Sequence, residues 1–279
     1  MDLSHPLTDY HFVAIDFETT GLSAARDRVI EIGAFRFQMN HLPASELSQL
    51  IDPQMPIPAM VTGIHGIQDQ DVKAQPTFKD FASKLMNFLD NTILLAHHAA
   101  FDMAFLTCEL RRAGIEPPPL TVLDSYHFAR QVLPAAPSYK LSALLDYLEI
   151  PMGQAHRALP DAIACAELFK ACLDKLPETG LTLAQLVEQY PQIRVGVQDL
   201  NPKEFPAQSS LQAAIQSQQD VLIAYRNARN ELLERRISPI LLGGYGRYSY
   251  VEAFCHLREA NRQFRIDRIQ SVRHWQPVA

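Results

Sequence analysis

Short runs of apolar residues, alternating or continuous, divide the first part of the chain into strands and a helix. Residues 11–17 form an apolar, β-branched run and residues 29–38 alternate with a period of two, which predicts two neighbouring strands joined by a glycine-containing turn. Residues 46–53 predict a third short strand that ends at Pro53, and the apolar spacing over 78–90 predicts a helix after it.

Strands and helices alternate in the next part of the chain. The continuous apolar run 92–97 is typical of a buried strand, and residues 100–113 then carry apolar side chains with a helical period. Prolines at 117–119 interrupt the pattern before helical segments at 141–150 and 161–176. Three strands followed by alternating helices and strands predict an α/β fold.

The last third of the chain has a different pattern. Scattered prolines and one short helical segment, 182–190, predict a linker over 179–206. A helical segment at 209–219 follows, and then come four strand-like runs, at 221–226, 232–242, 249–257 and 263–272. This order predicts a helix and a small β-barrel or curled sheet. We therefore expect one domain over residues 1–178 and a barrel domain over 207–279.

Length and composition support this division. A chain of 279 residues exceeds the usual size of one hydrophobic core, and 47% hydrophobic with 20% charged residues is typical of a globular protein and excludes a disordered one. The N-terminus lacks a signal-peptide pattern, and no apolar run approaches the ~18 residues of a membrane span. The cysteines show no paired spacing, so we expect reduced core residues and a cytoplasmic protein.

The net charge of −6 argues against a nucleic-acid partner until its distribution is considered. Residues 1–180 hold 13 Lys/Arg against 22 Asp/Glu, whereas residues 181–279 hold 12 against 9. All ten basic residues between 225 and 273 are arginine. Arginine favours bidentate contact with phosphate or carboxylate, and the alternative is a solvated, arginine-rich face of a sheet.

Two acids stand at the end of the first predicted strand. Asp16 and Glu18 are two residues apart, so both carboxylates project from one face of a strand. Acids disfavour strands, and two on one face of an apolar run repel each other unless cations compensate them. The alternative is an edge strand with a solvated acidic face.

Two further segments supply an acid near the start of a helix. Asp102 follows the buried strand 92–97, at the position where open α/β sheets bind ligands, although capping of the helix is the simpler explanation. Asp161 falls in the first turn of a helix that Pro160 begins, and His156 precedes it on a loop. A lone histidine before a helix is usually incidental, but here it accompanies four carboxylates.

These five residues suit the hydrolysis of a phosphodiester. Two metal ions about 4 Å apart can activate water and stabilise charge on the attacking and leaving oxygens. Carboxylate ligands without cysteine favour Mg²⁺ or Mn²⁺ over zinc. A histidine, with a pKa near ~6.5, is suited to accept the proton of the attacking water. We expect the metal ligands to be Asp16, Glu18, Asp102 and Asp161, with His156 as the general base.

The motifs DFETTGL, AHHAAFD and HRALPDA resemble, in this order, the three motifs of the DEDDh 3′→5′ exonucleases, over about residues 10–175. The resemblance implies a ribonuclease-H-like mixed sheet flanked by helices, two divalent metal ions and release of nucleoside 5′-monophosphates. His98 departs from the family, whose members commonly carry Asn there. The substrate-binding residues that the resemblance implies are Thr19, Thr20, Gly21, His65, Gly66, His98 and Phe101.

Residues 206–275 resemble a second family, the WYL domain, a small Sm/SH3-like β-barrel found in bacterial regulators of nucleic-acid metabolism and phage defence. The triad that names the family is replaced here by Ser249, Tyr250 and Val251. Because Arg265 and Arg268 are three residues apart, they face opposite sides of a regular strand. The ligand-site candidates that the resemblance implies are Tyr250, Arg262, Arg265 and Arg268. In the alternative, such arginines pair with nearby acids.

The sequence therefore predicts a 3′→5′ exonuclease that acts on DNA or RNA with a free 3′ end. Single-stranded DNA is the favoured substrate, although the motifs themselves do not discriminate DNA from RNA. The basic domain either holds single-stranded nucleic acid or binds a nucleotide or protein that gates the nuclease. A sensor that binds without cleaving is the non-enzymatic alternative. The sequence does not identify the pathway, the oligomeric state or a polymerase partner.

Overall fold

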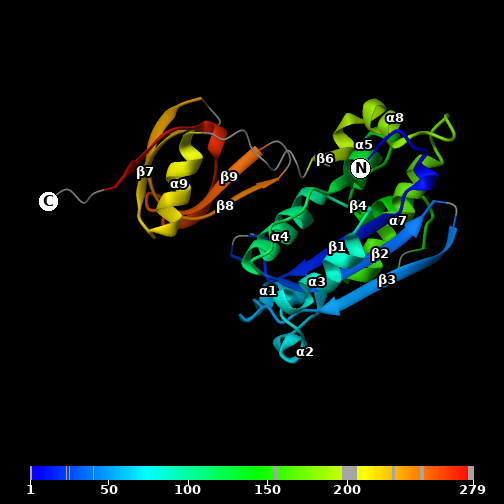
Figure 1. Ribbon diagram of the computed structural model, residues 1–279, viewed down its shortest axis with the longest axis horizontal. Helices are drawn as coiled ribbons and strands as arrows, with labels where there is room; N and C mark the ends of the chain where they lie inside the picture. The colour runs from blue at the N-terminus through cyan, green and yellow to red at the C-terminus, as the bar shows by residue number, and fades with distance from the viewer. Residues whose placement is uncertain are drawn as a thin grey trace. The chain divides into compact units, whose positions relative to one another are not determined.

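The structure of the protein is a computed structural model. It describes the chain except for residues 1, 23, 25, 40, 152, 154–155, 197–205, 228–229, 246–247 and 276–279. The chain forms two compact units, Met1–Gly196 and Val197–Ala279. Figure 1 gives the labels of helices and strands used below. The predicted linker falls partly outside the described residues, and the predicted domain limits at 178 and 207 stay predictions.

A six-stranded mixed sheet organises the first unit, in the order β3-β2-β1-β4-β5-β6. β2 and β3 are antiparallel to their neighbours, β4 and β5 run parallel to β1, and β6 is antiparallel to β5. The predicted α/β fold is confirmed, and the predicted linker contributes β6 to this sheet. The strands are β1 (Phe12–Thr19), β2 (Val29–Gln38), β3 (His41–Leu50), β4 (Ile93–Ala96), β5 (Thr121–Asp124) and β6 (Arg194–Gly196).

The helices of this unit lie along the sheet and at its ends (Figure 1). They are α1 (Ala59–His65), α2 (Asp69–Val72), α3 (Phe78–Leu89), α4 (Ala99–Arg112), α5 (Ser125–Val132), α6 (Leu141–Tyr147), α7 (Ala158–Leu173) and α8 (Leu183–Gln189), with 3₁₀ turns η1 (Leu7–Asp9) and η2 (Pro191–Ile193). The predicted helices over 78–90 and 100–113 are confirmed. Among the described residues, no helix is long and apolar enough to cross a membrane.

The face of the sheet that α7 covers carries a large aromatic core. Phe12 of β1 packs against Phe37 and Phe169, and all three side chains are almost fully buried. Because side chains alternate along a strand, Ala14, Asp16 and Glu18 project from the same face of β1 as Phe12. The hydrophobic core therefore ends where the two acids begin, beside the first turn of α7. All four cysteines are buried and free, as predicted.

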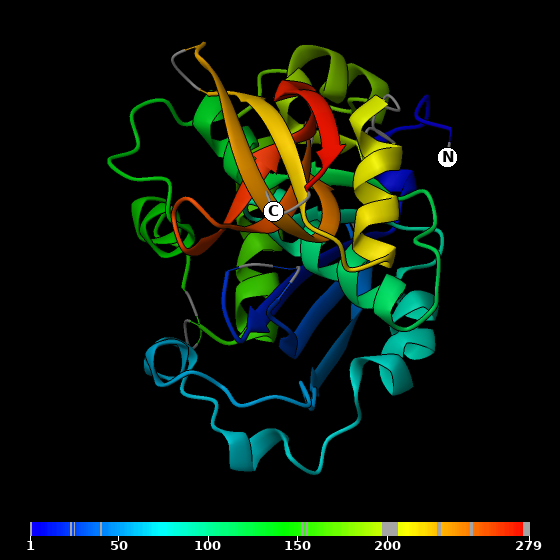
Figure 2. The ribbon, with the colours of Figure 1, turned by 90° about the vertical axis from the view of Figure 1, so that its left-hand side faces the viewer.

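The second unit is a curled antiparallel sheet with one helix packed on it. Figure 2 shows α9 (Pro206–Gln216) lying beside the sheet, where it contacts β8 and β11. Leu211 of α9 is fully buried among apolar strand residues. The strands follow the order β10-β9-β8-β7-β11. They are β7 (Val221–Arg226), β8 (Leu232–Tyr245), β9 (Tyr248–Cys255), β10 (Ala260–Arg265) and β11 (Ile269–His274).

Two predictions for this unit are wrong. The sheet does not close into a barrel, because β10 and β11 lie at its opposite edges in the described part of the chain. The predicted strand 263–272 is also interrupted by the 3₁₀ turn η4 (Ile266–Arg268). Ile266 of this turn is 1% exposed and belongs to the core. Burial of this side chain turns the backbone, so β11 pairs with β7 and not with β10.

Candidate metal-dependent nuclease site

Three acids meet at the end of β1 and the start of α7. One carboxylate oxygen from each of Asp16, Glu18 and Asp161 lies within 4.8 Å of the others. Asp161 stands in the first turn of α7, whose unpaired backbone N–H groups favour a negative charge. Its Oδ2 accepts a hydrogen bond from the backbone N–H of His156 at 3.2 Å. Its Oδ1 is buried and has no hydrogen-bond partner among the described residues.

Asp102, the fourth predicted metal ligand, contacts the same strand but does not belong to the group of three carboxylates. Asp102, in the first turn of α4, is 2% exposed, and its Oδ1 accepts the backbone N–H of Phe17 at 3.2 Å. This bond fixes α4 to β1 between the two acids of the strand. The prediction that capping alone explains Asp102 is therefore insufficient, since the carboxylate contacts a neighbouring strand.

Burial and mutual repulsion raise the pKa of every carboxyl group here. Burial, followed by the charges of Asp102, Asp161 and Glu18, raises the pKa of Asp16 well above its usual value. Burial also raises the pKa of Asp102, that of Glu18 to about 7 and that of Asp161 to about 6. Four such groups ionise together only when cations compensate them. The unpartnered Oδ1 of Asp161 and the oxygen-only donor set fit a hard divalent ion such as Mg²⁺.

His156 reaches this site from a loop. Its backbone has a left-handed φ of 58°, and its side chain is exposed. The backbone N–H of His156 donates to Asp161, and no side-chain hydrogen bond of His156 is found within the described part of the chain. An exposed imidazole on such a loop can turn toward a bound substrate, as a general base requires.

An ion pair that the sequence reasoning missed sets the start of α7. Arg157 donates from Nε and Nη2 to the carboxylate of Glu31 on β2, at 2.6 to 3.1 Å, and the N–H of Ala158 donates to the same carboxylate at 3.1 Å. Glu31 is 2% exposed. Gly33 allows this close approach, because a Cβ there would lie 2.0 Å from the carbonyl carbon of Ala158. The sequence did carry a signal for this ion pair, because Glu31 is an acid within the largely apolar run 29–38.

The loop after β1 is closed by its own hydrogen bonds. The backbone N–H of Thr20 donates to Arg28 O and that of Arg28 donates to Thr20 Oγ1, both at 2.9 Å. Thr19 Oγ1 donates to Gly21 O at 2.6 Å. A Cβ at Gly21 would lie 2.4 Å from Asp27 Oδ2, so a larger residue there would require the Asp27 side chain to shift.

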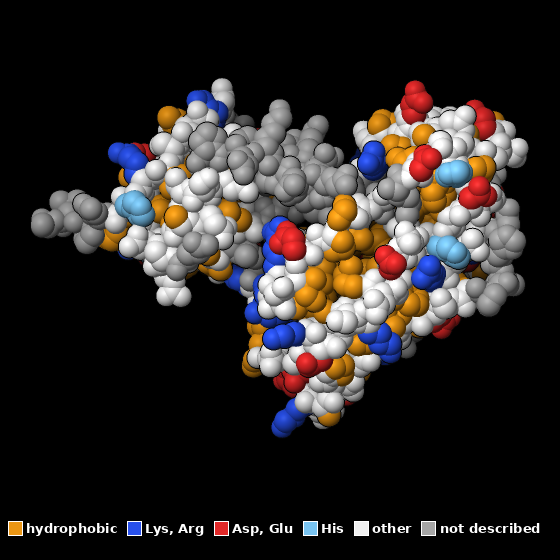
Figure 3. Space-filling model, in the orientation of Figure 1, with side chains coloured by type: hydrophobic (Ala, Val, Ile, Leu, Met, Phe, Trp, Pro, Cys, Tyr) orange, Lys and Arg blue, Asp and Glu red, His pale blue; other side chains and the backbone are white. Residues whose placement is uncertain are grey.

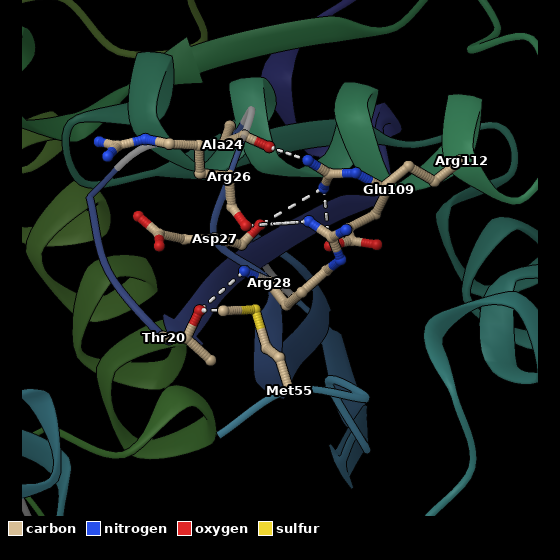
Figure 4. Close-up of polar contacts among 8 residues, drawn as sticks. All are labelled: Thr20, Ala24, Arg26, Asp27, Arg28, Met55, Glu109 and Arg112. Atoms are coloured by element: carbon tan, nitrogen blue, oxygen red, sulfur yellow. Dashed lines mark hydrogen bonds and ion pairs between the residues drawn. The ribbon is translucent and has the colours of Figure 1, made fainter. Parts of the chain in front are cut away.

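The last turn of α4 holds the same loop from the other side. Figure 4 shows Arg112 donating to the carbonyl oxygens of Ala24 and Asp27, at 2.6 and 3.4 Å, while it pairs with Glu109 at 3.0 Å. Arg28 donates to two carbonyl oxygens of the loop as well. Helix α4 thus supports both Asp102 at its start and the loop beside the acids at its end.

His65 and Gly66, two of the predicted substrate-binding residues, lie at the end of α1. Gly66 caps the helix with a left-handed φ of 75°. His65 is 6% exposed, and its Nδ1 accepts the N–H of Ile67 at 3.0 Å, which leaves the proton of the neutral ring on Nε2. Burial lowers the pKa of His65, and the charge of Glu31 partly opposes this shift.

His98 and Phe101 occupy the start of α4. His98 has a left-handed φ of 66°, and its ring lies 3.8 Å from that of Tyr126. Phe101 is half-buried and packs against Phe105 with ring centroids 4.9 Å apart. Both residues therefore lie at the start of α4, the helix whose first turn holds Asp102.

The first unit does not present a uniformly acidic surface despite its charge. On the face drawn in Figure 3, its Lys and Arg side chains are interspersed with Asp and Glu side chains. The acidic excess is therefore no argument against a polyanionic substrate at that face.

The predicted ligand-site residues of the second unit do not share one strand. Tyr250 and Arg265 are cross-strand neighbours on β9 and β10, and Arg265 forms a bidentate ion pair with Asp267. Arg262 is exposed on β10, whereas Arg268 belongs to η4. Because β10 ends at Arg265, Arg265 and Arg268 do not lie on one regular strand, and the expectation that they face opposite sides stays a prediction.

Comparisons with known families agree with these two units. The sequence model of the exonuclease family matches residues 13–169, and that of the WYL domain matches residues 206–274. The chain belongs to the exonuclease family. Its exonuclease-family domain is followed by a WYL domain.

Among its relatives is the DNA polymerase III subunit epsilon of Treponema pallidum, 39% identical over 160 residues that cover 57% of this chain and 74% of that protein. The PolC-type DNA polymerase III of Caldanaerobacter subterraneus is 35% identical over 170 residues, which cover 61% of this chain and 12% of that polymerase. The 3′-5′ exonuclease DinG of Bacillus subtilis is 35% identical over 63% of this chain and 19% of its own length. The chain thus spans a small part of several relatives.

Solved structures share the fold. The E. coli exonuclease I complex with single-stranded DNA superposes with a TM-score of 0.58 and 18% identity, over 88% of this chain and 54% of that chain. The nuclease domain of 3′hExo, a DEDDh family member bound to rAMP, gives a TM-score of 0.52 and 18% identity, over 59% of this chain and 92% of that chain. These neighbours confirm the ribonuclease-H-like fold.

Proposed function

We propose that this chain removes nucleotides from the 3′ end of nucleic acid and releases nucleoside 5′-monophosphates, with single-stranded DNA as the favoured substrate. The observation that carries the proposal is the group formed by Asp16, Glu18 and Asp161, in which the buried Oδ1 of Asp161 has no hydrogen-bond partner among the described residues. The exonuclease relatives support it.

Two divalent ions, Mg²⁺ or Mn²⁺, would be bound by the four acids Asp16, Glu18, Asp102 and Asp161. When bound, such ions make water more acidic and stabilise charge on the attacking and leaving oxygens. The chain prepares this site by holding Asp102 through the N–H of Phe17 and Asp161 through the N–H of His156. The bond from His156 leaves Oδ1 of Asp161 without a hydrogen-bond partner among the described residues.

His156 would accept the proton of the attacking water on its imidazole. The water oxygen then bonds to phosphorus, the bond from phosphorus to the 3′ oxygen breaks, and that oxygen takes a proton from solvent. Arg157, the next residue, is anchored to Glu31, so the base stands beside a fixed point of the backbone. The terminal nucleotide would contact the ends of β1 and α1, through Thr19, Thr20, Gly21, His65 and Gly66. His98 and Phe101, at the start of α4, would also contact the substrate.

The direct test incubates the purified chain with Mg²⁺ or Mn²⁺ and end-labelled single-stranded DNA, single-stranded RNA or duplex DNA. We expect shortening from the 3′ end that chelation stops and that Asp161→Asn reduces by at least about 100-fold. Asp174→Asn is the matched control, because Asp174 is exposed just after α7. A wild-type protein that shortens none of the substrates contradicts the proposal, and a fully active Asp16→Ala variant contradicts the assigned site.

A second proposal concerns the WYL domain, which would either hold single-stranded nucleic acid or gate the nuclease on binding a nucleotide or protein. Arg262, exposed on β10, supports direct holding. Arg262→Gln should weaken single-strand affinity and lower its salt dependence, whereas Arg273→Gln, which breaks an exposed ion pair with Glu234, serves as the control. Unchanged affinity together with activity that responds to an added nucleotide would favour gating.

A further inference from the structure

A cluster of aromatic and basic side chains lies at the carboxyl ends of β4 and β5. The rings of His98 and Tyr126 lie against each other, with centroids 3.8 Å apart and tilted by 30°. Tyr139 meets Tyr126 edge to face at 6.2 Å, and the guanidinium of Arg130 lies 5.6 and 5.7 Å from these two tyrosine rings. His98 and Arg130 are exposed, and both tyrosines are half-buried. We call these four residues the aromatic platform.

Strand register places the platform level with the acidic site. Leu95 of β4 pairs with Ala14 of β1, and Ala96 pairs with Asp124 of β5. His98 comes two residues after Ala96, Tyr126 comes two residues after Asp124, and Asp16 comes two residues after Ala14. Neighbouring strands are about 4.8 Å apart, so the platform lies one and two strand positions from the acids of β1, along the same edge of the sheet.

The platform is held rigidly from below. Asp124, 2% exposed, accepts the backbone N–H groups of His98 at 3.3 Å, Ala99 at 3.2 Å and Tyr126 at 2.9 Å. One carboxylate therefore fixes the starts of both α4 and α5. It also holds His98 in the left-handed region, which costs a residue other than glycine free energy and commonly marks a functional site.

A second buried contact fixes the far side of the platform. His97 hydrogen bonds through Nε2 to the carbonyl oxygen of Tyr139 at 3.0 Å, and its Nδ1 lies 2.9 Å from Ser125 Oγ. Because a carbonyl only accepts, Nε2 carries the proton and Nδ1 accepts from the serine hydroxyl. The loop before α6 is thereby tied to β4.

Arg130 supplies the positive charge of the platform. Within the described residues, Arg130 forms no ion pair with an acid, and its guanidinium donates only a 3.4 Å hydrogen bond to the hydroxyl of Tyr126. Lys140, which follows Tyr139, is exposed as well. Stacked rings next to free cations are the chemistry that binds single-stranded nucleic acid, where bases stack on the rings and cations contact the phosphates.

We propose that the aromatic platform is a binding subsite for nucleotides on the 5′ side of the scissile phosphate, where one base stacks on the His98 and Tyr126 pair and Arg130 contacts the adjoining phosphate. This inference rests on the exonuclease function proposed above. A base that stacks on protein has left its own duplex, so the subsite selects single strands. Stacking is insensitive to sequence, since every base offers an aromatic face.

The test uses the full chain with Mn²⁺ and single-stranded oligonucleotides that carry one abasic residue at the second, third, fourth or fifth position from the 3′ end. We measure kcat/KM for removal of the terminal nucleotide. Wild type should lose at least about fivefold at one of these positions relative to the intact strand. Tyr126→Leu should remove this abasic penalty and lower kcat/KM on the intact strand, and Tyr126→Phe should restore both.

Arg130→Gln should raise KM and leave the abasic penalty in place, because it removes a phosphate contact and not a ring. Tyr147→Leu is the matched control, since Tyr147 is 46% exposed at the end of α6. An equal rate for abasic and intact strands at all four positions, or a penalty that persists in Tyr126→Leu, overturns the subsite. Failure of the proposed function gives a different result, in which wild type cleaves no strand at all.

Discussion

The ion pair between Glu31 and Arg157 offers a quantitative test of how α7 is positioned. Glu31→Gln keeps the shape of the side chain but removes the charge that meets a bidentate guanidinium and the N–H of Ala158. Removing one partner of a fully buried pair costs about 3–5 kcal/mol, because the other charge is left without compensation. The side chains of Glu31 and Arg157 are 3% and 35% exposed, so water partly replaces the lost partner. We therefore expect a loss of about 2 kcal/mol.

Urea denaturation followed by far-ultraviolet circular dichroism measures this loss. With a slope of about 2 kcal/mol per molar urea, the midpoint of the first unit should fall by about 1 M. The single tryptophan, Trp275, belongs to the second unit, so the transition seen by tryptophan fluorescence should not move. Nuclease activity should fall as well, since Asp161 and His156 stand on the segment that the ion pair anchors.

Glu167→Gln is the control for this experiment, because Glu167 forms an i,i+3 ion pair with Lys170 on the exposed side of α7. Such a pair contributes about 0.3–0.5 kcal/mol. Equal stability losses in the two variants would refute the reasoning, since burial would then make no difference to the value of the charge.

Three further predictions follow from other parts of the structure. Gly33→Ala should lower the free energy of unfolding by more than about 3 kcal/mol, because its Cβ would meet the backbone of Ala158. Gly63→Ala is the control and should be neutral or slightly stabilising, because a Cβ there meets nothing within 4 Å. Similar melting temperatures of the two variants would contradict this prediction. Burial acts to raise the pKa of Asp220, but hydrogen bonds from Ser238 and Arg236 outweigh burial, so the pKa is lower in the folded state than in the unfolded state. The carboxylate therefore stabilises the second unit at pH values above its unfolded pKa. This stabilisation is lost as the pH falls through the lower pKa of the folded state. Denaturation followed by tryptophan fluorescence between about pH 2 and 7 should therefore show a shallower acid loss in Asp220→Asn, and an unchanged slope would contradict the assignment. Mn²⁺ should raise the melting temperature of wild type and not that of Asp161→Asn, because only a ligand of the folded state stabilises it; equal shifts would place the ion elsewhere.

The strands and long helices of the first unit could be predicted because their signals are local. The run 92–97 and the period of 100–113 each give the type of element without reference to the rest of the chain. The short helices α1 and α2 could not be predicted, since seven and four residues hold too little periodicity. The open sheet of the second unit was missed for a different reason. Whether β10 pairs with β11 depends on the burial of Ile266, which is a tertiary contact.

The candidate site divides in the same way. Asp16 and Glu18 could be placed on one face from strand geometry, and the order of the three motifs located Asp102, His156 and Asp161. The pairing of Glu31 with Arg157 could not be foreseen, because 126 residues separate the two side chains. Local spacing predicts what one element presents, but it does not predict which distant element a buried charge requires.

Acids at strand-to-helix junctions show why the structure was needed to separate two roles. Asp124 and Asp161 both stand at the start of a helix, where a negative charge is favoured in either case. Asp124 has both carboxylate oxygens occupied by backbone N–H groups, including those of Tyr126 and Ala99. Asp161 has one oxygen occupied and one buried without a partner among the described residues. The first carboxylate is satisfied by the protein and therefore builds the platform, whereas the second needs a cation. On this criterion Asp124→Asn should disturb base stacking while metal affinity is kept, and Asp161→Asn should do the reverse.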